Sequence, residues 1–119
     1  MIANKISDLI VFKTLKNIKH GFLEIKNFDG KILKFGKIDD QLKARIEIKH
    51  PSLNYNLIRK GSIGLAESYM QGYFETNNLS NLIEITAKNI KLIYKFSGIL
   101  DFSAINFLKN KIIKNTKKR

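Results

Sequence analysis

Few residue types in this chain could carry out covalent or metal chemistry. The 119 residues include no cysteine, which excludes thiolate nucleophiles, disulfides and the usual structural zinc sites. The two histidines, His20 and His50, are too few for a zinc site, and both lie where a predicted element ends. Histidines in such places more often face solvent or bond carbonyls than act as catalysts. The sequence therefore predicts no catalytic residue, no metal ligand and no cofactor-binding residue.

The charged residues best suited to binding lie at the C-terminal end. The chain has 22 Lys and Arg against 10 Asp and Glu, a net charge of +12, but the excess is uneven. Residues 61–87 hold three glutamates and no Lys or Arg, whereas residues 88–119 hold nine basic residues and one acid. Such a basic segment is typical of proteins that bind nucleic acids or phospholipid headgroups. The expected contacts to anionic lipid are Lys109, Lys111, Lys114, Lys117, Lys118 and Arg119.

These cations belong to a predicted helix that Asp101 can cap. One side of its helical wheel carries apolar side chains: Phe102, Ile105, Leu108, Ile112 and Ile113. Four of the lysines occupy the opposite side, so residues 101–119 are predicted to form a basic amphipathic helix, a type that favours anionic membranes. At about 1 kcal/mol per cation, six cations set an upper bound of ~6 kcal/mol before salt screening. A solvated connector to a further domain is the alternative.

A second group of residues is marked by spacing. Residues 61–75 read GSIGLAESYMQGYFE, with a motif formed by Gly61, Gly64, Glu67, Tyr69 and Gly72. The glycines suit helix ends and close packing, which favours a structural interpretation of the motif. The alternative interpretation is a lipid-facing or domain-docking surface. Glu67 is least explained by packing, because a buried carboxylate needs a partner. The aromatic cluster of Tyr69, Tyr73 and Phe74 is interpreted as core in preference to a stacking platform.

The elements that position these residues follow from hydrophobic periodicity. Apolar residues near one helical face, including Ile6, Leu9, Ile10 and Phe12, predict a first helix over residues 6–18. The period then changes to two, which predicts a hairpin starting at residue 22 and a third strand over residues 42–49. We expect a small antiparallel sheet of about three strands or more, with one apolar face that needs a cover.

The hairpin register follows from the choice of loop. A three-residue loop over residues 28–30 pairs Ile25 with Leu33 and Leu23 with Phe35, so that four apolar residues share one face. A two-residue loop would mix polar and apolar side chains on each face. The sequence therefore predicts the three-residue loop.

Four helices are predicted to follow the sheet and cover its apolar face. Residues 52–60 form a helix that ends at Gly61, and residues 62–70 form one closed by Gly72. A third helix runs from Asn77 or Asn78 through residue 93, and the last is the basic helix already described. The predicted fold class is therefore α+β, with one domain over residues 1–119.

The Gly61–Glu75 segment, with Asn78-Leu79 and Leu82 after it, resembles the N-terminal domain of cyclopropane-fatty-acyl-phospholipid synthases, which are S-adenosylmethionine-dependent methyltransferases. That domain reads G-x-x-G-x-x-E-x-Y-x-x-G, then an aromatic residue and an Asp-Leu helix start, where this chain has Asn78. Further features resemble the family in order and spacing, so that the likeness covers effectively the whole chain: the Asp29-Gly30 hairpin, His50-Pro51, Asn89 and the basic residues 114–119.

The resemblance implies a sterol-carrier-like lipid-binding fold and a role in the modification of phospholipid acyl chains. No residue here matches the family's catalytic set and no G-x-G-x-x-G is present, so we expect no enzyme activity from this chain alone. The expected function is a non-catalytic, lipid-associating domain that acts with a catalytic methyltransferase domain or subunit in trans, or occurs as a fragment. Its expected place is cytoplasmic, peripheral on the inner face of a bacterial membrane.

A small basic nucleic-acid-binding protein is the alternative. Only three of the 22 basic residues are Arg, no strand combines aromatic and basic residues, and the basic helix has an apolar opposite face. These features favour an anionic phospholipid surface over nucleic acid as the partner. The longest strictly apolar run, residues 9–12, is far shorter than the ~20 residues of a bilayer span, and no signal peptide is expected.

Overall fold

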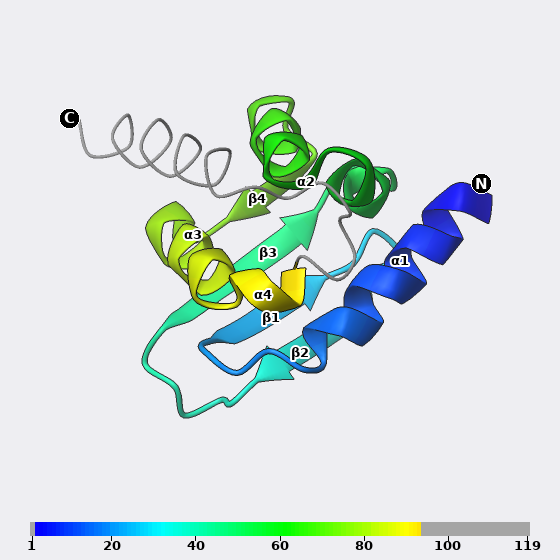
Figure 1. The fold of residues 1–119 in the computed structure, drawn as a ribbon. Coiled ribbons are helices and arrows are strands. Elements are labelled where there is room, and N and C mark those ends of the chain that lie inside the picture. The colour runs from blue at the N-terminus through cyan, green and yellow to red at the C-terminus, as the bar shows by residue number, and fades with distance from the viewer. Residues whose placement is uncertain (1, 94–119) are drawn as a thin grey trace.

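The computed structural model describes residues 2–93, which fold into a sheet with helices over one of its faces (Figure 1). In chain order the elements are α1 (Ile2–Leu15), β1 (Phe22–Lys26), β2 (Ile32–Gly36), β3 (Lys43–Ile48), α2 (Leu53–Met70), β4 (Phe74–Thr76), α3 (Leu79–Lys88) and α4 (Ile90–Ile93). The α+β fold class is confirmed. The predicted helix over residues 101–119 lies outside the described residues.

The β1–β2 hairpin has the predicted register. Ile25 pairs with Leu33 and Leu23 pairs with Phe35, while Glu24 lies opposite Lys34 on the other face. The loop of residues 28–30 closes through a hydrogen bond from the Gly30 N–H to the Asn27 carbonyl at 2.9 Å. Gly30 has a φ of 92°, which an L side chain rarely adopts, so the loop type depends on this glycine.

The expectation that all strands of the sheet are antiparallel is wrong. The sheet has four strands in the order β2-β1-β3-β4, and β3 pairs with β1 in parallel. Periodicity shows which residues of a strand face the core but not which strand lies next to it. The strand β1 lies in the interior of the sheet, and three of its five residues are buried. The strand β2 lies at the edge, and only its Phe35 is buried. The short β4 has too few residues to show an alternating pattern.

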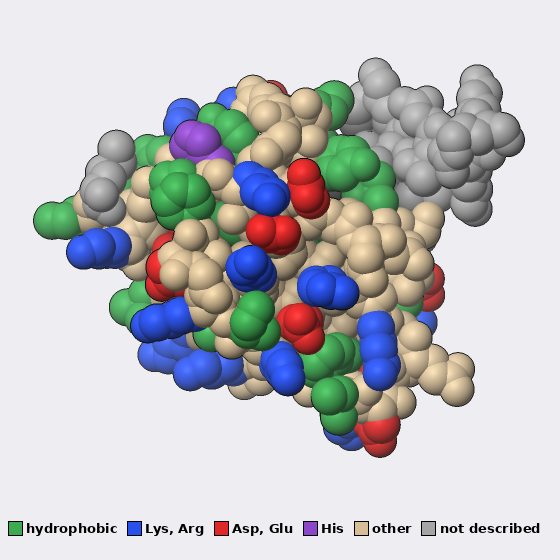
Figure 2. Space-filling model, turned by 180° about the vertical axis from the view of Figure 1, so that it is seen from behind, with side chains coloured by type: hydrophobic (Ala, Val, Ile, Leu, Met, Phe, Trp, Pro, Cys, Tyr) green, Lys and Arg blue, Asp and Glu red, His purple; other side chains and the backbone are tan. Residues whose placement is uncertain are grey.

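The core lies between the sheet and the helices, as predicted. The inward side chains of β1 and β3 are apolar and buried, among them Ile25, Ala44 and Ile46. In Figure 1, α1, α3 and α4 lie in front of the sheet, and α2 contacts both α1 and β4. The opposite face is open, and Figure 2 shows basic and acidic side chains interleaved across it. There Glu47 pairs with Lys49 at 3.1 Å and with Lys26 at 3.8 Å.

The helix boundaries after the sheet largely agree with the predicted ones, whereas α1 runs over Ile2–Leu15 and not over residues 6–18. Gly61 interrupts α2 with non-helical angles (φ 59°, ψ −134°), so that two helical segments meet at a kink. Asn78 caps α3, and its side chain accepts a hydrogen bond from the Asn81 N–H at 2.9 Å. The helix predicted to continue to residue 93 is broken at Asn89, where α3 ends and α4 begins. No helix within residues 2–93 is long and apolar enough to cross a membrane.

Candidate functional site

The three glycines of the Gly61–Gly72 motif meet backbone requirements of α2. Gly61 adopts the positive φ of the kink, and a Cβ on Gly64 would overlap the carbonyl oxygen of Asn56 in the preceding helical segment. Gly72 follows the C-cap with a φ of 77°, and the N–H of Tyr73 bonds the Ser68 carbonyl at 2.8 Å, which is a Schellman ending. This geometry accords with the structural interpretation of the motif.

Glu67 lies at the surface of α2 and bridges the kink. Its carboxylate accepts a hydrogen bond from the Lys60 ammonium at 2.9 Å, and both side chains are close to half exposed. An exposed pair of this kind contributes at most about 1 kcal/mol. Glu67 thus has a charged partner, which a buried carboxylate would have needed, but its side chain is half exposed and does not lie in the core.

The aromatic residues near the motif divide between core and surface. Phe74 is 2% exposed and belongs to the core, as predicted, whereas Tyr69 is 38% exposed and contacts the Phe74 ring at a tilt. The rings of Tyr73 and His50 stack, with centroids 4.0 Å apart. The Nδ1 atom of His50 accepts a hydrogen bond from the Ser52 N–H at 3.1 Å, and this bond stabilises the turn before α2.

The apolar residues of α1 are divided between two sides of the helix. Leu9, Ile6 and Ile2 are 68%, 53% and 75% exposed, whereas Val11 is 2% exposed. The inward side of α1 combines the buried Val11 with polar contacts to α2, because the carboxylate of Asp8 accepts a hydrogen bond from the Asn54 amide at 3.0 Å. Burial raises the pKa of Asp8, and the bond from Asn54 opposes that rise.

The outward side of α1 carries lysines beside its apolar residues. With a step of roughly 100° per residue, Leu9, Ile2, Ile6 and Ile10 occupy one arc of the helix. Lys13 continues that arc toward the C-terminal end of the helix. The two lysines of α1, Lys5 and Lys13, are exposed, and so is Lys16 directly after the helix. The apolar arc and these lysines are called the α1 surface below. Asp8, the only acid within α1, faces inward toward α2, so the α1 surface presents cations and apolar side chains together.

A cleft of about 340 Å³ lies between the residues that follow α1 and the α3–α4 junction. Its polar lining includes Lys19 and His20 from the first segment and Lys88 and Lys91 from the second. Ile90 and Leu92 add an apolar wall. The sequence analysis did not identify this group, because its two segments are about 70 residues apart.

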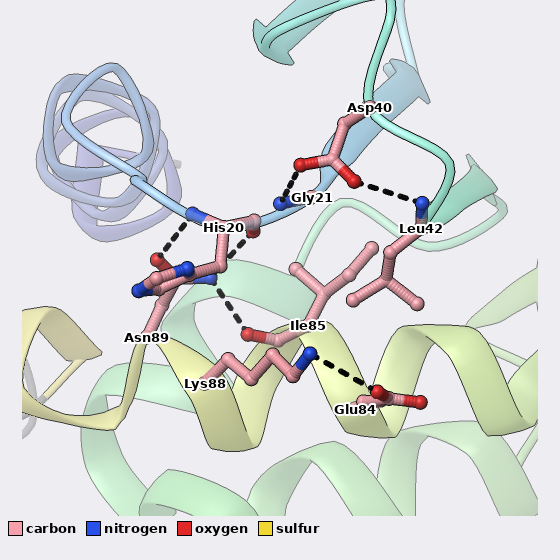
Figure 3. Close-up of polar contacts among 8 residues, drawn as sticks. All are labelled: His20, Gly21, Asp40, Leu42, Glu84, Ile85, Lys88 and Asn89. Atoms are coloured by element: carbon pink, nitrogen blue, oxygen red, sulfur yellow. Dashed lines mark hydrogen bonds and ion pairs between the residues drawn. The ribbon is translucent and has the colours of Figure 1, made fainter.

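Asn89 joins the two walls of this cationic cleft (Figure 3). Its side-chain oxygen accepts hydrogen bonds from the N–H groups of Lys19 and His20 at 2.9 and 3.3 Å. Its amide nitrogen donates to the carbonyls of His20 and Ile85, both at 2.8 Å. All of the hydrogen-bonding capacity of this buried side chain is therefore used to hold the segment after α1 against the end of α3.

A second set of polar contacts, centred on Asp40, lies beside the cleft and is called the Asp40 brace below. The two carboxylate oxygens of Asp40 accept hydrogen bonds from the N–H groups of Gly21 and Leu42, each at 2.9 Å (Figure 3). The bond from Leu42 has the largest effect in lowering the pKa of Asp40, and the bond from Gly21 follows. The charges of Lys88 and His20 lower the pKa further. The Asp40 brace ties the start of β1 to the loop that leads into β3, so it supports the parallel pairing.

A family model described as a domain of unknown function, DUF7884, matches residues 10–95. The chain belongs to this family. No curated protein and no solved structure matches the chain. The family match includes the cationic cleft, Asn89 and the whole Gly61–Gly72 motif, but it begins at Ile10 and so leaves out the first half of the α1 surface.

The remaining candidate residues lie outside the structural description. Lys109, Lys111, Lys114, Lys117, Lys118 and Arg119 belong to the undescribed segment, so their contact with anionic lipid stays a prediction. Within residues 2–93, no three His, Asp or Glu side chains lie close enough together to hold a metal ion. The described candidates for binding are therefore the α1 surface and the cationic cleft.

Proposed function

We propose that this domain associates with the surface of anionic phospholipid membranes and does not itself catalyse a reaction. It acts beside a methyltransferase domain or subunit that modifies phospholipid acyl chains, as the resemblance to the N-terminal domain of cyclopropane-fatty-acyl-phospholipid synthases implies. Its place is the cytoplasmic side of the membrane, held there peripherally.

The observation that carries this proposal is the composition of the α1 surface. Ile2 and Leu9 are each more than two-thirds exposed, whereas the polar residues Asn4 and Asp8 of the same helix bond Ser52 and Asn54 at the start of α2. Scattered exposed apolar residues need no explanation, but a continuous arc on one helix indicates a binding surface. Lysines beside that arc are the arrangement by which amphipathic helices lie in an anionic membrane interface.

Charge complementarity makes an anionic bilayer a better partner than a neutral one. Lys5, Lys13 and Lys16 are exposed, and each contributes about 1 kcal/mol near an anionic lipid surface. On the open face of the sheet, by contrast, the cations alternate with glutamates such as Glu47, which pairs with Lys26 and Lys49. That face therefore lacks the continuous positive field that nucleic-acid binding requires.

Co-sedimentation of the full chain with anionic and neutral vesicles, at low and high salt, tests the proposal. We expect binding to anionic vesicles that weakens with salt, and at least a tenfold loss of partitioning in the Ile6→Ser/Leu9→Ser double variant. Complete burial of one such side chain is worth about 1.5–3 kcal/mol, and 1.4 kcal/mol is tenfold. The matched control is Ile38→Ser/Met70→Ser, which removes two side chains that are 64% and 73% exposed elsewhere on the molecule.

Three results would contradict the proposal. These are equal pelleting with both vesicle types, no pelleting with either, and equal losses in the two double variants. Duplex DNA is the competing ligand in a parallel titration. Its binding is electrostatic and should be the same in both double variants. Binding of DNA without binding of vesicles would favour the nucleic-acid alternative instead.

A further inference from the structure

We propose that the cationic cleft between the end of α1 and α4 binds a phosphate group that is esterified to an organic residue. The cleft is separate from the α1 surface, and it extends the proposed function by assigning a ligand to a second place in the domain. It rests on the proposed function only for the source of the phosphate, which is either a lipid headgroup or a soluble phosphate ester.

The charges around the cleft favour an oxyanion. Lys19, Lys88 and Lys91 supply three ammonium groups, and the exposed His20 imidazole adds a further donor. Two acids lie nearby, and the structure shows what each one binds. The Asp40 oxygens accept backbone N–H groups, and Glu84 pairs with Lys88 at 3.3 Å.

The Glu84–Lys88 pair does not prevent phosphate binding. Both side chains are about half exposed, and a surface pair four residues apart in a helix is worth only about 0.3–0.5 kcal/mol. A phosphate carries up to two negative charges and three strong acceptor oxygens, so it can attract the Lys88 ammonium more strongly than one exposed carboxylate does.

Rigid walls make the cleft a preformed site. The backbone of Lys19 and His20 is held by Asn89, whose side chain is 6% exposed, and the same residue bonds the last turn of α3. The backbone of Lys19 and His20 therefore keeps its position relative to the last turn of α3 without a ligand. Less conformational freedom is then lost on binding than in a flexible loop, which favours affinity.

The apolar wall indicates an ester and not inorganic phosphate alone. Ile90 and Leu92 line the same cleft as the lysines, and a volume of about 340 Å³ is within the range of pockets that hold small organic ligands. The phosphate oxygens would meet the ammonium groups while the organic residue contacts this wall. A glycerophosphate or the headgroup region of a phospholipid has this combination of a phosphate and less polar carbon atoms.

Nuclear magnetic resonance titration of the full chain tests the inference. The probes are inorganic phosphate, glycerol 3-phosphate and dihexanoyl phosphatidic acid below its micelle concentration, with potassium chloride at matched ionic strength as the blank. We expect the His20 ring resonances to shift with the phosphate probes and not with chloride. We also expect the two esters to bind more tightly than inorganic phosphate.

The decisive variant is Lys19→Gln/Lys88→Gln/Lys91→Gln, in which affinity for the esters should fall at least tenfold. Its matched control is Lys31→Gln/Lys34→Gln/Lys60→Gln, which removes the same charge and likewise breaks one exposed ion pair, that of Lys60 with Glu67. The control should change affinity less than twofold. Equal affinities in the two triple variants, or no His20 shift with any phosphate probe, would overturn the inference.

The two esters distinguish the sources of the phosphate. Binding of dihexanoyl phosphatidic acid at least tenfold tighter than glycerol 3-phosphate assigns the site to lipid headgroups, and equal binding assigns it to soluble esters. The proposals also fail separately. The Ile6→Ser/Leu9→Ser variant should retain phosphate binding if only the membrane role is wrong, and the cleft variant should still pellet with anionic vesicles if only the phosphate site is wrong.

Discussion

Replacing Asn89 with alanine is expected to reduce the free energy of unfolding by about 2–4 kcal/mol. The Asn89 side chain makes four hydrogen bonds, three of them at 2.9 Å or shorter and one at 3.3 Å. Each such bond contributes about 0.5–1.5 kcal/mol net, and a buried group left without a partner costs more. Since Asn89 is 6% exposed, water cannot freely replace its amide in the variant.

Guanidinium denaturation of the full chain, followed by circular dichroism, measures this loss. The control is Asn81→Ala, because the Asn81 side chain donates one exposed hydrogen bond, to the Lys43 carbonyl at 2.8 Å. The control should cost less than about 1 kcal/mol, since alanine also has the higher helix propensity. A loss of about 3 kcal/mol corresponds to a fall in Tm of roughly 12–24 °C for a domain of this size. A loss in Asn89→Ala no larger than in the control would refute the reasoning.

Asn89→Asp separates hydrogen bonding from packing. The aspartate has nearly the same shape, but it replaces the donating amide with an oxygen that faces the carbonyls of His20 and Ile85. At neutral pH it should therefore destabilise the domain at least as much as alanine does. It should also weaken phosphate binding at the cleft by adding a negative charge. A near-native stability of Asn89→Asp would show that the side chain acts by filling space.

Two further predictions concern α2 and the Asp40 brace. Gly64→Ala should cost about 1–3 kcal/mol, because its Cβ would overlap the rigid carbonyl oxygen of Asn56, and a native denaturation midpoint would contradict this. The lowered pKa of Asp40 means that its stabilising contribution is complete well above the ordinary value of 3.8 and is lost as the pH falls through the lowered pKa. Unfolding measured from pH 7 to pH 2 should therefore show a smaller loss on acidification in Asp40→Asn than in the parent chain, and identical pH profiles would exclude this role.

Several elements could be predicted from the sequence because neighbouring residues determine them. The β1–β2 register follows from alternating side chains and from a loop that requires Gly30 in a left-handed conformation. The kink at Gly61 and the cap at Asn78 are local for the same reason. In each case the backbone groups that need a partner, or a special dihedral angle, lie within four residues of the side chain that provides it.

The strand neighbours and the orientation of α1 could not be predicted in this way. Alternation identifies the buried face of β3 but is the same whether β3 pairs with β2 or with β1. The helix α1 has apolar residues on two sides, and periodicity does not show which side faces the core. In the structure Val11 and Phe12 pack inward, while Ile6 and Leu9 are exposed. The bond from Asn54 to Asp8 accompanies this arrangement, and it joins residues 46 positions apart.

The candidate sites divide along the same line. The hairpin, the glycine positions of α2 and the excess of positive charge could be predicted from residue types and short spacings. The outward positions of Ile6 and Leu9, and the place of Lys19 across a cleft from Lys88, are visible only in the folded chain. Those positions depend on contacts between segments distant in the sequence, among them the Asn89 bonds that span about 70 residues.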